Sequence, residues 1–139
     1  MKIERYLILL ILVIPVLILR DFTPNNELKY LSIVDEALRD GHFFTFFHQG
    51  ELYADKPPLY FRLLMLSKWI WGEYNMFGLS LFSIIPALIS IYIMNKWVEE
   101  ETTTSLRWNG SLMLFTSAFF IGSGLVLRMD MLMCMFILL

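Results

Sequence analysis

Long apolar stretches separated by polar ones divide the chain into four hydrophobic blocks. The blocks are residues 3–20, 77–97, 110–127 and 131–139. A helix that crosses a bilayer needs about 20 mostly apolar residues, so the first three blocks predict transmembrane helices. The last block is too short to span and predicts an incomplete helix. We therefore expect either that the chain is part of a longer protein or that a partner completes it.

The first block has two interpretations. A basic start, MKIER, followed by an apolar run is also typical of a secretory signal peptide. However, the run ends at Arg20-Asp21 and has no cleavage site made of small residues. We therefore interpret residues 3–20 as an uncleaved anchor, since a membrane helix tolerates a proline such as Pro15.

The amino-acid composition is typical of a membrane protein. Of the 139 residues, 58% are hydrophobic and 17% are charged, whereas globular domains have about half and about a quarter. The net charge of −2 gives no indication of nucleic-acid binding. The single cysteine, Cys134, excludes an internal disulfide. The predicted fold class is an all-α, polytopic transmembrane helical protein.

The loop between the first two apolar blocks, residues 21–76, predicts amphipathic helices that lie against the membrane. The stretch TPNNELKYLSIVDEALRDG has Thr23 as a candidate N-cap, Pro24 in the first turn and Gly41 as a stop. A second helix is predicted for PPLYFRLLMLSKWIW. The aromatic segment between them, GHFFTFFHQGELY, is expected to be irregular or briefly extended.

Glu27 occupies an unexpected position on the first of these helices. At 100° per residue it falls on the same face as Leu31 and Val34, within about 40° of each. One interpretation is an acid in the first turn that favours the helix dipole and leans out to water. The other is a carboxylate directed into a protein cavity, because a lone buried carboxylate needs a partner.

The stretch YADKPPLYF precedes the second helix and carries Asp55 beside Lys56. If Asp55 were the N-cap, its usual hydrogen-bond donors would be the N–H groups of Pro57 and Pro58, which prolines lack. Asp55 is therefore left available. Lys56 lies at the positive end of the helix, where an ammonium is unfavourable unless an anion such as phosphate binds with it. The alternative is a solvated Asp55–Lys56 pair.

Arg128 and Asp130 form a third polar group, placed between the last two apolar blocks in LRMDML. Ionisable side chains at this position serve either as interface anchors or as the lining of a site in the outer leaflet.

The order of these features resembles the GT-C superfamily of polyprenyl-phosphate-sugar-dependent glycosyltransferases. It is most similar to the bacterial branch near the lipid A aminoarabinose transferases and the protein O-mannosyltransferases. The resemblance covers essentially all 139 residues, and only the N-terminal part of such an enzyme. It implies transfer of a sugar from a polyprenyl-phosphate donor to a lipid, glycan or protein acceptor, with inversion. It also implies a multi-pass protein of the bacterial inner membrane whose loop of residues 21–76 is extracytoplasmic.

The resemblance also assigns residues. The Asp-Glu pair of the family falls on Asn26-Glu27, and because an amide cannot act as the base, Glu27 or Asp21 would take that role. The acid-Lys-Pro motif falls on Asp55-Lys56-Pro57, where the family associates the acid with a metal or polar site and the lysine with the carrier phosphate. The roles implied are catalysis by Glu27, Asp130 and Asp21, substrate or phosphate binding by Lys56, Arg128 and Asn26, and a divalent metal ion at Asp55.

Two other classes of function are weighed against this enzyme. The shortness of the chain and its unfinished last helix favour a small non-catalytic membrane interaction or assembly protein. Half of a transporter is less favoured, because the ionisable groups cluster at the outer face and transport sites usually lie near mid-membrane.

Overall fold

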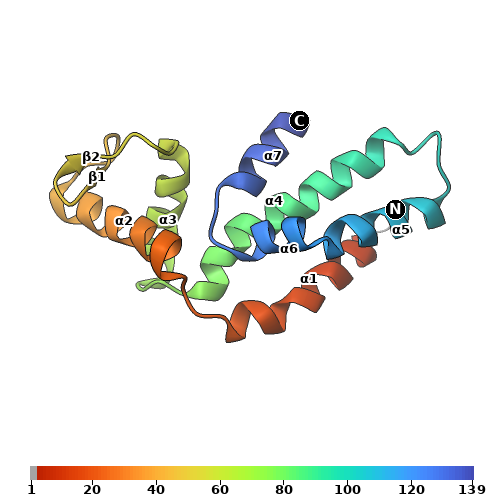
Figure 1. The fold of residues 1–139 in the computed structure, drawn as a ribbon, viewed down its shortest axis with the longest axis horizontal. Coiled ribbons are helices and arrows are strands. Elements are labelled where there is room, and N and C mark those ends of the chain that lie inside the picture. Colours follow the sequence, from red (N-terminus) through yellow and green to blue (C-terminus); the bar gives the residue numbers. More distant parts are fainter. Residues whose placement is uncertain (1–2) are drawn as a thin grey trace. The chain divides into compact units, whose positions relative to one another are not determined.

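The computed structural model describes residues 3–139, and these fold mostly into helices (Figure 1). This confirms the predicted helical class. By chain-contact density the protein divides into two compact units: unit 1 is Met1–Arg20 with Ser80–Leu139, and unit 2 is Asp21–Leu79. The elements, in order, are α1 (Ile3–Leu19), the π-helical turn η1 (Pro24–Leu28), α2 (Lys29–Asp40), β1 (Phe47–His48), β2 (Glu51–Leu52), α3 (Pro58–Trp71), α4 (Met76–Trp97), α5 (Thr104–Thr116), α6 (Ala118–Leu125) and α7 (Asp130–Leu138).

One helix among the described residues is by itself long and apolar enough to cross a membrane. This helix is α4, with 22 residues; α6 and α7 pass the same test only as a pair, and they are bent by 110°. The helices predicted for residues 3–20 and 77–97 are present as α1 and α4. The structure thus gives one candidate span, compatible with membrane association.

The predicted single helix over residues 110–127 is wrong, because the chain breaks at Ser117. This residue has φ −63° and ψ 134° and lies between α5 and α6. Thr116 Oγ1 donates to the Leu112 carbonyl (2.7 Å) and Ser117 Oγ donates to the Leu114 carbonyl (2.8 Å). Hydroxyl groups that bond to carbonyls in this way compete with regular helix hydrogen bonds, and the helix ends there.

The core of unit 1 is formed by buried residues of α1, α4, α5, α6 and α7 together. Buried residues recur along α1 at helical spacing, and Ile84, Ala87 and Ile91 of α4 are also buried in this core. Gly124 of α6 allows close approach, since a Cβ there would lie 3.4 Å from Ile84 Cδ1. The α1 members of the core are Tyr6, Leu9, Val13 and Leu17.

Unit 2 is built on the contact between α2 and α3. The predicted amphipathic helix is confirmed, with Thr23 as the N-cap residue and Gly41 ending it in the left-handed conformation at φ 74°. Its first turn is π-helical, because the Leu28 N–H donates to the Thr23 carbonyl (3.3 Å). The buried residues of unit 2 include Tyr30, Leu31, Ile33, Val34, Ala37, Phe46, Tyr60, Phe61, Leu64 and Met65.

A short antiparallel hairpin, β1–β2, replaces part of the segment that was expected to be irregular or extended. Its turn residues Gln49 and Gly50 both have positive φ, 56° and 80°, as a tight hairpin turn requires. Positive φ is uncommon for a residue such as glutamine. Glu36 of α2 stabilises this turn, because its two carboxylate oxygens accept hydrogen bonds from the N–H groups of Gln49 and Gly50, each at 2.9 Å.

Replacing Glu36 by glutamine is expected to loosen this hairpin. The substitution removes the negative charge shared by two N–H donors, which is worth about 1 kcal/mol at a partly exposed site. Amide hydrogen exchange at residues 47–52 of the full chain should then be about fivefold faster. The exposed Glu51 changed to glutamine is the matched control. Equal exchange in both variants would contradict the role assigned to Glu36.

Candidate phosphate-binding site

Four side chains of unit 2 are linked to one another by contacts, and we call Lys29, Tyr53, Asp55 and Lys56 the Tyr53 cluster. The Lys29 ammonium lies 4.8 Å from the centre of the Tyr53 ring. The Tyr53 hydroxyl donates to Asp55 Oδ2 at 3.1 Å, and Lys56 Nζ lies 3.5 Å from the same oxygen. Two ammonium groups and one carboxylate leave the cluster with one net positive charge.

The hairpin and the double proline hold the cluster in place. The Tyr53 N–H donates to the Phe46 carbonyl (2.8 Å), and the ring packs edge-on against Phe61 at 5.9 Å. The residue before a proline is held extended, and this keeps Lys56 outside α3, with its ammonium 3.5 Å from Asp55 Oδ2. The prediction that Pro57 belongs to the helix is wrong: it is the N-cap, with ψ 136°. Asp55 lies before the cap, as its missing donors predicted.

The Tyr53 hydroxyl is held in its protonated form. Burial, and then the hydrogen bond and negative charge of Asp55, raise the pKa of Tyr53 to about 12. The hydroxyl is therefore a donor at physiological pH. Its single proton is donated to Asp55, so an anion that approaches the cluster meets the two ammonium groups of Lys29 and Lys56, and phosphate oxygens accept from such groups.

Glu27 is completely buried, with 0% of its surface exposed. The inward orientation predicted from helical phase is confirmed, and the interpretation that it leans out to water is wrong. Its Oε2 accepts the Thr23 N–H at 2.6 Å and the Thr23 hydroxyl at 3.0 Å. In a capping box the acid is three residues after the N-cap; here it is four, because the first turn is π-helical. Glu27 therefore stabilises the start of the helix.

Asp21 and Asn26 are exposed on the segment that leads into α2. The Asn26 carbonyl accepts the Lys29 N–H at the end of η1, so the backbone links this segment to the Tyr53 cluster. The catalytic and binding roles predicted for the two side chains remain predictions.

Arg128 and Asp130 belong to unit 1 and form an ion pair of 2.7 Å between Nε and Oδ2. The Ser83 hydroxyl of α4 donates to the Arg128 carbonyl at 3.1 Å. Asp130 begins α7, where a carboxylate favours the helix dipole. The pair thus fastens the connection between α6 and α7, and its predicted role in a site stays a prediction.

The residues around Asp55 do not fit a divalent metal ion. Its carboxylate faces the Lys56 ammonium and the Tyr53 hydroxyl proton, whereas a hard cation needs several oxygen ligands without a neighbouring positive charge. Throughout residues 3–139, no group of three or more His, Cys, Asp or Glu side chains is placed to hold a metal.

Lys29 and Tyr53 were not predicted as site residues from the sequence. Lys29 falls on the polar face of its helix, and Tyr53 was read as one aromatic among many. One feature of the sequence could have identified Tyr53. It is two residues before Asp55, and this spacing places both side chains on one side of an extended segment.

No family model matches this chain, and no curated protein or solved structure shows significant similarity to it. The function must therefore be argued from the residues themselves.

Proposed function

We propose that the chain is the N-terminal part of a GT-C-like glycosyltransferase. It would take a sugar from a polyprenyl-phosphate donor and pass it to a lipid, glycan or protein acceptor, with inversion at the anomeric carbon. The observation that supports this best is the Tyr53 cluster, in which Lys56 and the Tyr53 hydroxyl contact the Asp55 carboxylate and Lys29 lies over the Tyr53 ring. The cluster lies in the loop between the apolar α1 and the candidate span α4.

An exposed apolar face on α3 supports a position of unit 2 at the membrane surface. Trp69 is 83% exposed, although tryptophan is costly to leave in water. Only four residues, 72–75, separate α3 from α4, so they span at most about 14 Å. Tryptophan is enriched at the headgroup level of membranes. Other exposed apolar residues of α3 are Leu59, Leu66, Ile70 and Trp71.

In this proposal the protein is multi-pass, with α1 joining the candidate span α4 in the membrane and unit 2 on the extracytoplasmic face of a bacterial inner membrane. The orientation and the membrane follow from the resemblance, whereas the proximity of α3 to the bilayer follows from its exposed face and short connection. A polyprenyl phosphate with its tail in the outer leaflet would then present its phosphate at the level of the Tyr53 cluster.

In the proposed reaction, the acceptor oxygen forms a bond to the anomeric carbon while the bond from that carbon to the carrier phosphate breaks. Lys56 and Lys29 would stabilise the negative charge on the departing phosphate. A carboxylate would take the acceptor proton, an effect worth about 10²–10⁴-fold in rate. Glu27 could do so only after releasing Thr23, and Asp21 is the exposed alternative. The roles of Arg128, Asp130 and Asn26 rest on the resemblance alone.

The second candidate is a non-catalytic membrane interaction or assembly protein. The capping contacts of Glu27 favour it, because they account for a buried carboxylate without any catalysis. The two candidates differ in one respect that can be measured. Only the enzyme requires a site that prefers a polyprenyl phosphate to the corresponding alcohol.

The proposal predicts that the purified full chain binds undecaprenyl phosphate in detergent about tenfold more tightly than undecaprenol. Lys56→Gln should remove this preference, because a hydrogen bond to a charged group is worth about tenfold in affinity. Arg39→Gln is the matched control, since it removes one positive charge from an exposed side chain of the same unit. Native mass spectrometry can measure both affinities. Equal binding of alcohol and phosphate, or an unchanged preference in Lys56→Gln, would contradict the proposal.

A further inference from the structure

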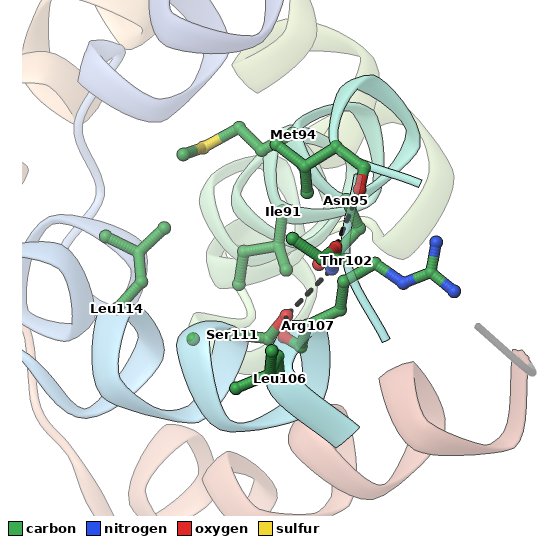
Figure 2. A pocket seen from close by; sticks show the side chains of 10 residues that line it. Ile91, Met94, Asn95, Thr102, Leu106, Arg107, Ser111 and Leu114 are labelled. Atoms are coloured by element: carbon green, nitrogen blue, oxygen red, sulfur yellow. Dashed lines mark hydrogen bonds between the residues drawn. The ribbon is translucent and has the colours of Figure 1, made fainter. Parts of the chain in front are cut away.

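Unit 1 contains a cavity of about 330 Å³ between the last turns of α4 and the helix α5 (Figure 2). Its walls are mostly apolar, with Ile91 and Met94 from α4, Val98 directly after α4, and Leu106 and Leu114 from α5. Cavities of this size and lining are typical of sites for apolar ligands. The cavity has no part in the function proposed for unit 2.

The polar groups on the floor of the cavity are already satisfied. Asn95 Nδ2 donates to Ser111 Oγ at 2.7 Å, drawn as a dashed line in Figure 2, and lies 3.2 Å from the Tyr6 hydroxyl. Ser111 Oγ in turn donates to the Arg107 carbonyl at 2.8 Å. These residues bind one another, and they leave the apolar walls to contact a ligand.

Arg107 differs from Asn95 and Ser111, because it is a buried cation and one of its N–H donors has no acceptor among the described residues. Only 9% of its surface is exposed. Its Nη1 donates to the Glu99 carbonyl at 3.1 Å and its Nη2 to Thr104 Oγ1 at 3.3 Å. Its Nε is buried and, within the part of the chain described, has no hydrogen-bond partner. A guanidinium has five N–H donors, and a buried donor without an acceptor is costly.

The charges around Arg107 favour a ligand with one negative charge. Glu99 lies 3.4 Å from Arg107 and 3.2 Å from Lys96, so two cations share one carboxylate. Figure 2 shows the guanidinium directed away from Ile91 and Leu114, so the charged end and the apolar end of the cavity are opposite. A second, polar cavity of about 240 Å³ adjoins this region and shares Asn95 with the first; Tyr6, Tyr92, Lys96 and Glu99 complete its lining.

The position along α4 indicates where the ligand comes from. Ile91 to Val98 cover the end of the candidate membrane span, and phospholipid phosphates lie at the ends of such spans. The phosphodiester of a phospholipid carries one negative charge and continues into acyl chains. The exposed Glu100 and Glu101 follow Glu99 in the chain, so a headgroup that also carries an ammonium suits this end.

We propose that this cavity binds one bilayer phospholipid of the phosphatidylethanolamine type. An acyl chain would lie between α4 and α5, and the phosphodiester would accept from Arg107 and Lys96. The inference rests on α4 crossing the membrane, as in the proposed function, and it is independent of the Tyr53 cluster.

Gly110 offers a way to fill the cavity without disturbing the fold. It lines the cavity, and a Cβ added there meets no atom within 4 Å, so a leucine side chain extends into the space that the acyl chain would occupy. Gly122 of α6 is the matched control, because a Cβ there also meets nothing within 4 Å and the residue is not part of the cavity lining.

The test uses the delipidated full chain in detergent, to which phosphatidylethanolamine or diacylglycerol is added, with bound lipid counted by native mass spectrometry. We expect one phosphatidylethanolamine, bound about tenfold more tightly than diacylglycerol. Gly110→Leu should weaken binding at least about tenfold, while Gly122→Leu and Lys56→Gln retain it. Arg107→Met should bind both lipids equally. Binding unaffected by Gly110→Leu, or no preference for the phosphate-bearing lipid in the unaltered chain, would overturn the proposal.

Discussion

Replacing Phe61 by alanine is expected to lower the free energy of unfolding of unit 2 by about 3–5 kcal/mol. Phe61 is completely buried in α3, and the shortened side chain would leave a cavity at the centre of an aromatic cluster. Ring centroids surround it at 4.7–6.4 Å: those of Phe46, Tyr53, Tyr30 and Tyr60. Hydrogen exchange of the amides of α2 and α3 in the full chain measures the change.

Phe61→Ala also connects the fold to the proposed site. Because the Tyr53 ring packs on Phe61, loss of this contact should weaken binding of undecaprenyl phosphate together with stability. The control is Phe44→Ala, since Phe44 is 77% exposed and its ring contacts Arg62 at the surface. That change should cost about 1 kcal/mol or less. Similar protection in the two variants would show that the aromatic cluster is not the core of unit 2.

The second large effect is expected for Glu27→Ala, which should lower the free energy of unfolding of unit 2 by about 2–4 kcal/mol. Its carboxylate accepts two hydrogen bonds from Thr23, and its burial means that alanine leaves a void as well as unpaired donors. Amide exchange should rise first at residues 23–31, where η1 passes into α2, and later elsewhere in unit 2.

Glu27→Gln distinguishes the hydrogen bonds of the helix cap from the effect of the negative charge, because it removes the charge and keeps an acceptor. A glutamine oxygen can still accept the Thr23 N–H, so this variant should lose about 1 kcal/mol and retain its binding of undecaprenyl phosphate, as Glu27 is not part of the Tyr53 cluster. If Glu27→Ala and Glu27→Gln were equally unstable, the negative charge of Glu27, rather than its hydrogen bonds, would be what stabilises unit 2. If neither lost protection, the cap itself would be refuted.

Local pattern was sufficient to predict several elements of this fold. The helix of residues 29–40 follows from its periodic apolar face and from the glycine that ends it. The burial of Glu27 agrees with the same phase, which centres the residue on the apolar face, although the sequence also allowed a first-turn acid that leans out to water. The absence of an Asp55 cap follows from proline chemistry, since two consecutive prolines have no N–H to donate.

The parts that were missed depend on contacts between distant segments. The hairpin turn uses Gln49 in a conformation that its side chain does not favour, and Glu36, thirteen residues earlier, stabilises it. The break at Ser117 occurs within a run that is apolar enough for a continuous helix. Hydropathy cannot predict it, because the hydroxyl groups act through their hydrogen bonds and change the average very little.

The Tyr53 cluster also depends on a contact between distant segments of the chain. Lys56 could be singled out from its position before two prolines, whereas Lys29 comes from a different helix and joins it only through the Tyr53 ring. A sequence motif identifies residues that are neighbours along the chain. A cluster assembled from α2 and from the segment between β2 and α3 requires the tertiary structure.

The most direct measurement is a photo-crosslinking experiment on the full chain in a membrane. An undecaprenyl phosphate analogue with a photoreactive group beside its phosphate is activated by light, and the labelled peptide is sequenced. The account predicts labelling within residues 29–62, reduced by competing undecaprenyl phosphate and by Lys56→Gln, and unaffected by undecaprenol. Label found solely in residues 80–139, or label that undecaprenol displaces as well as the phosphate does, would contradict it.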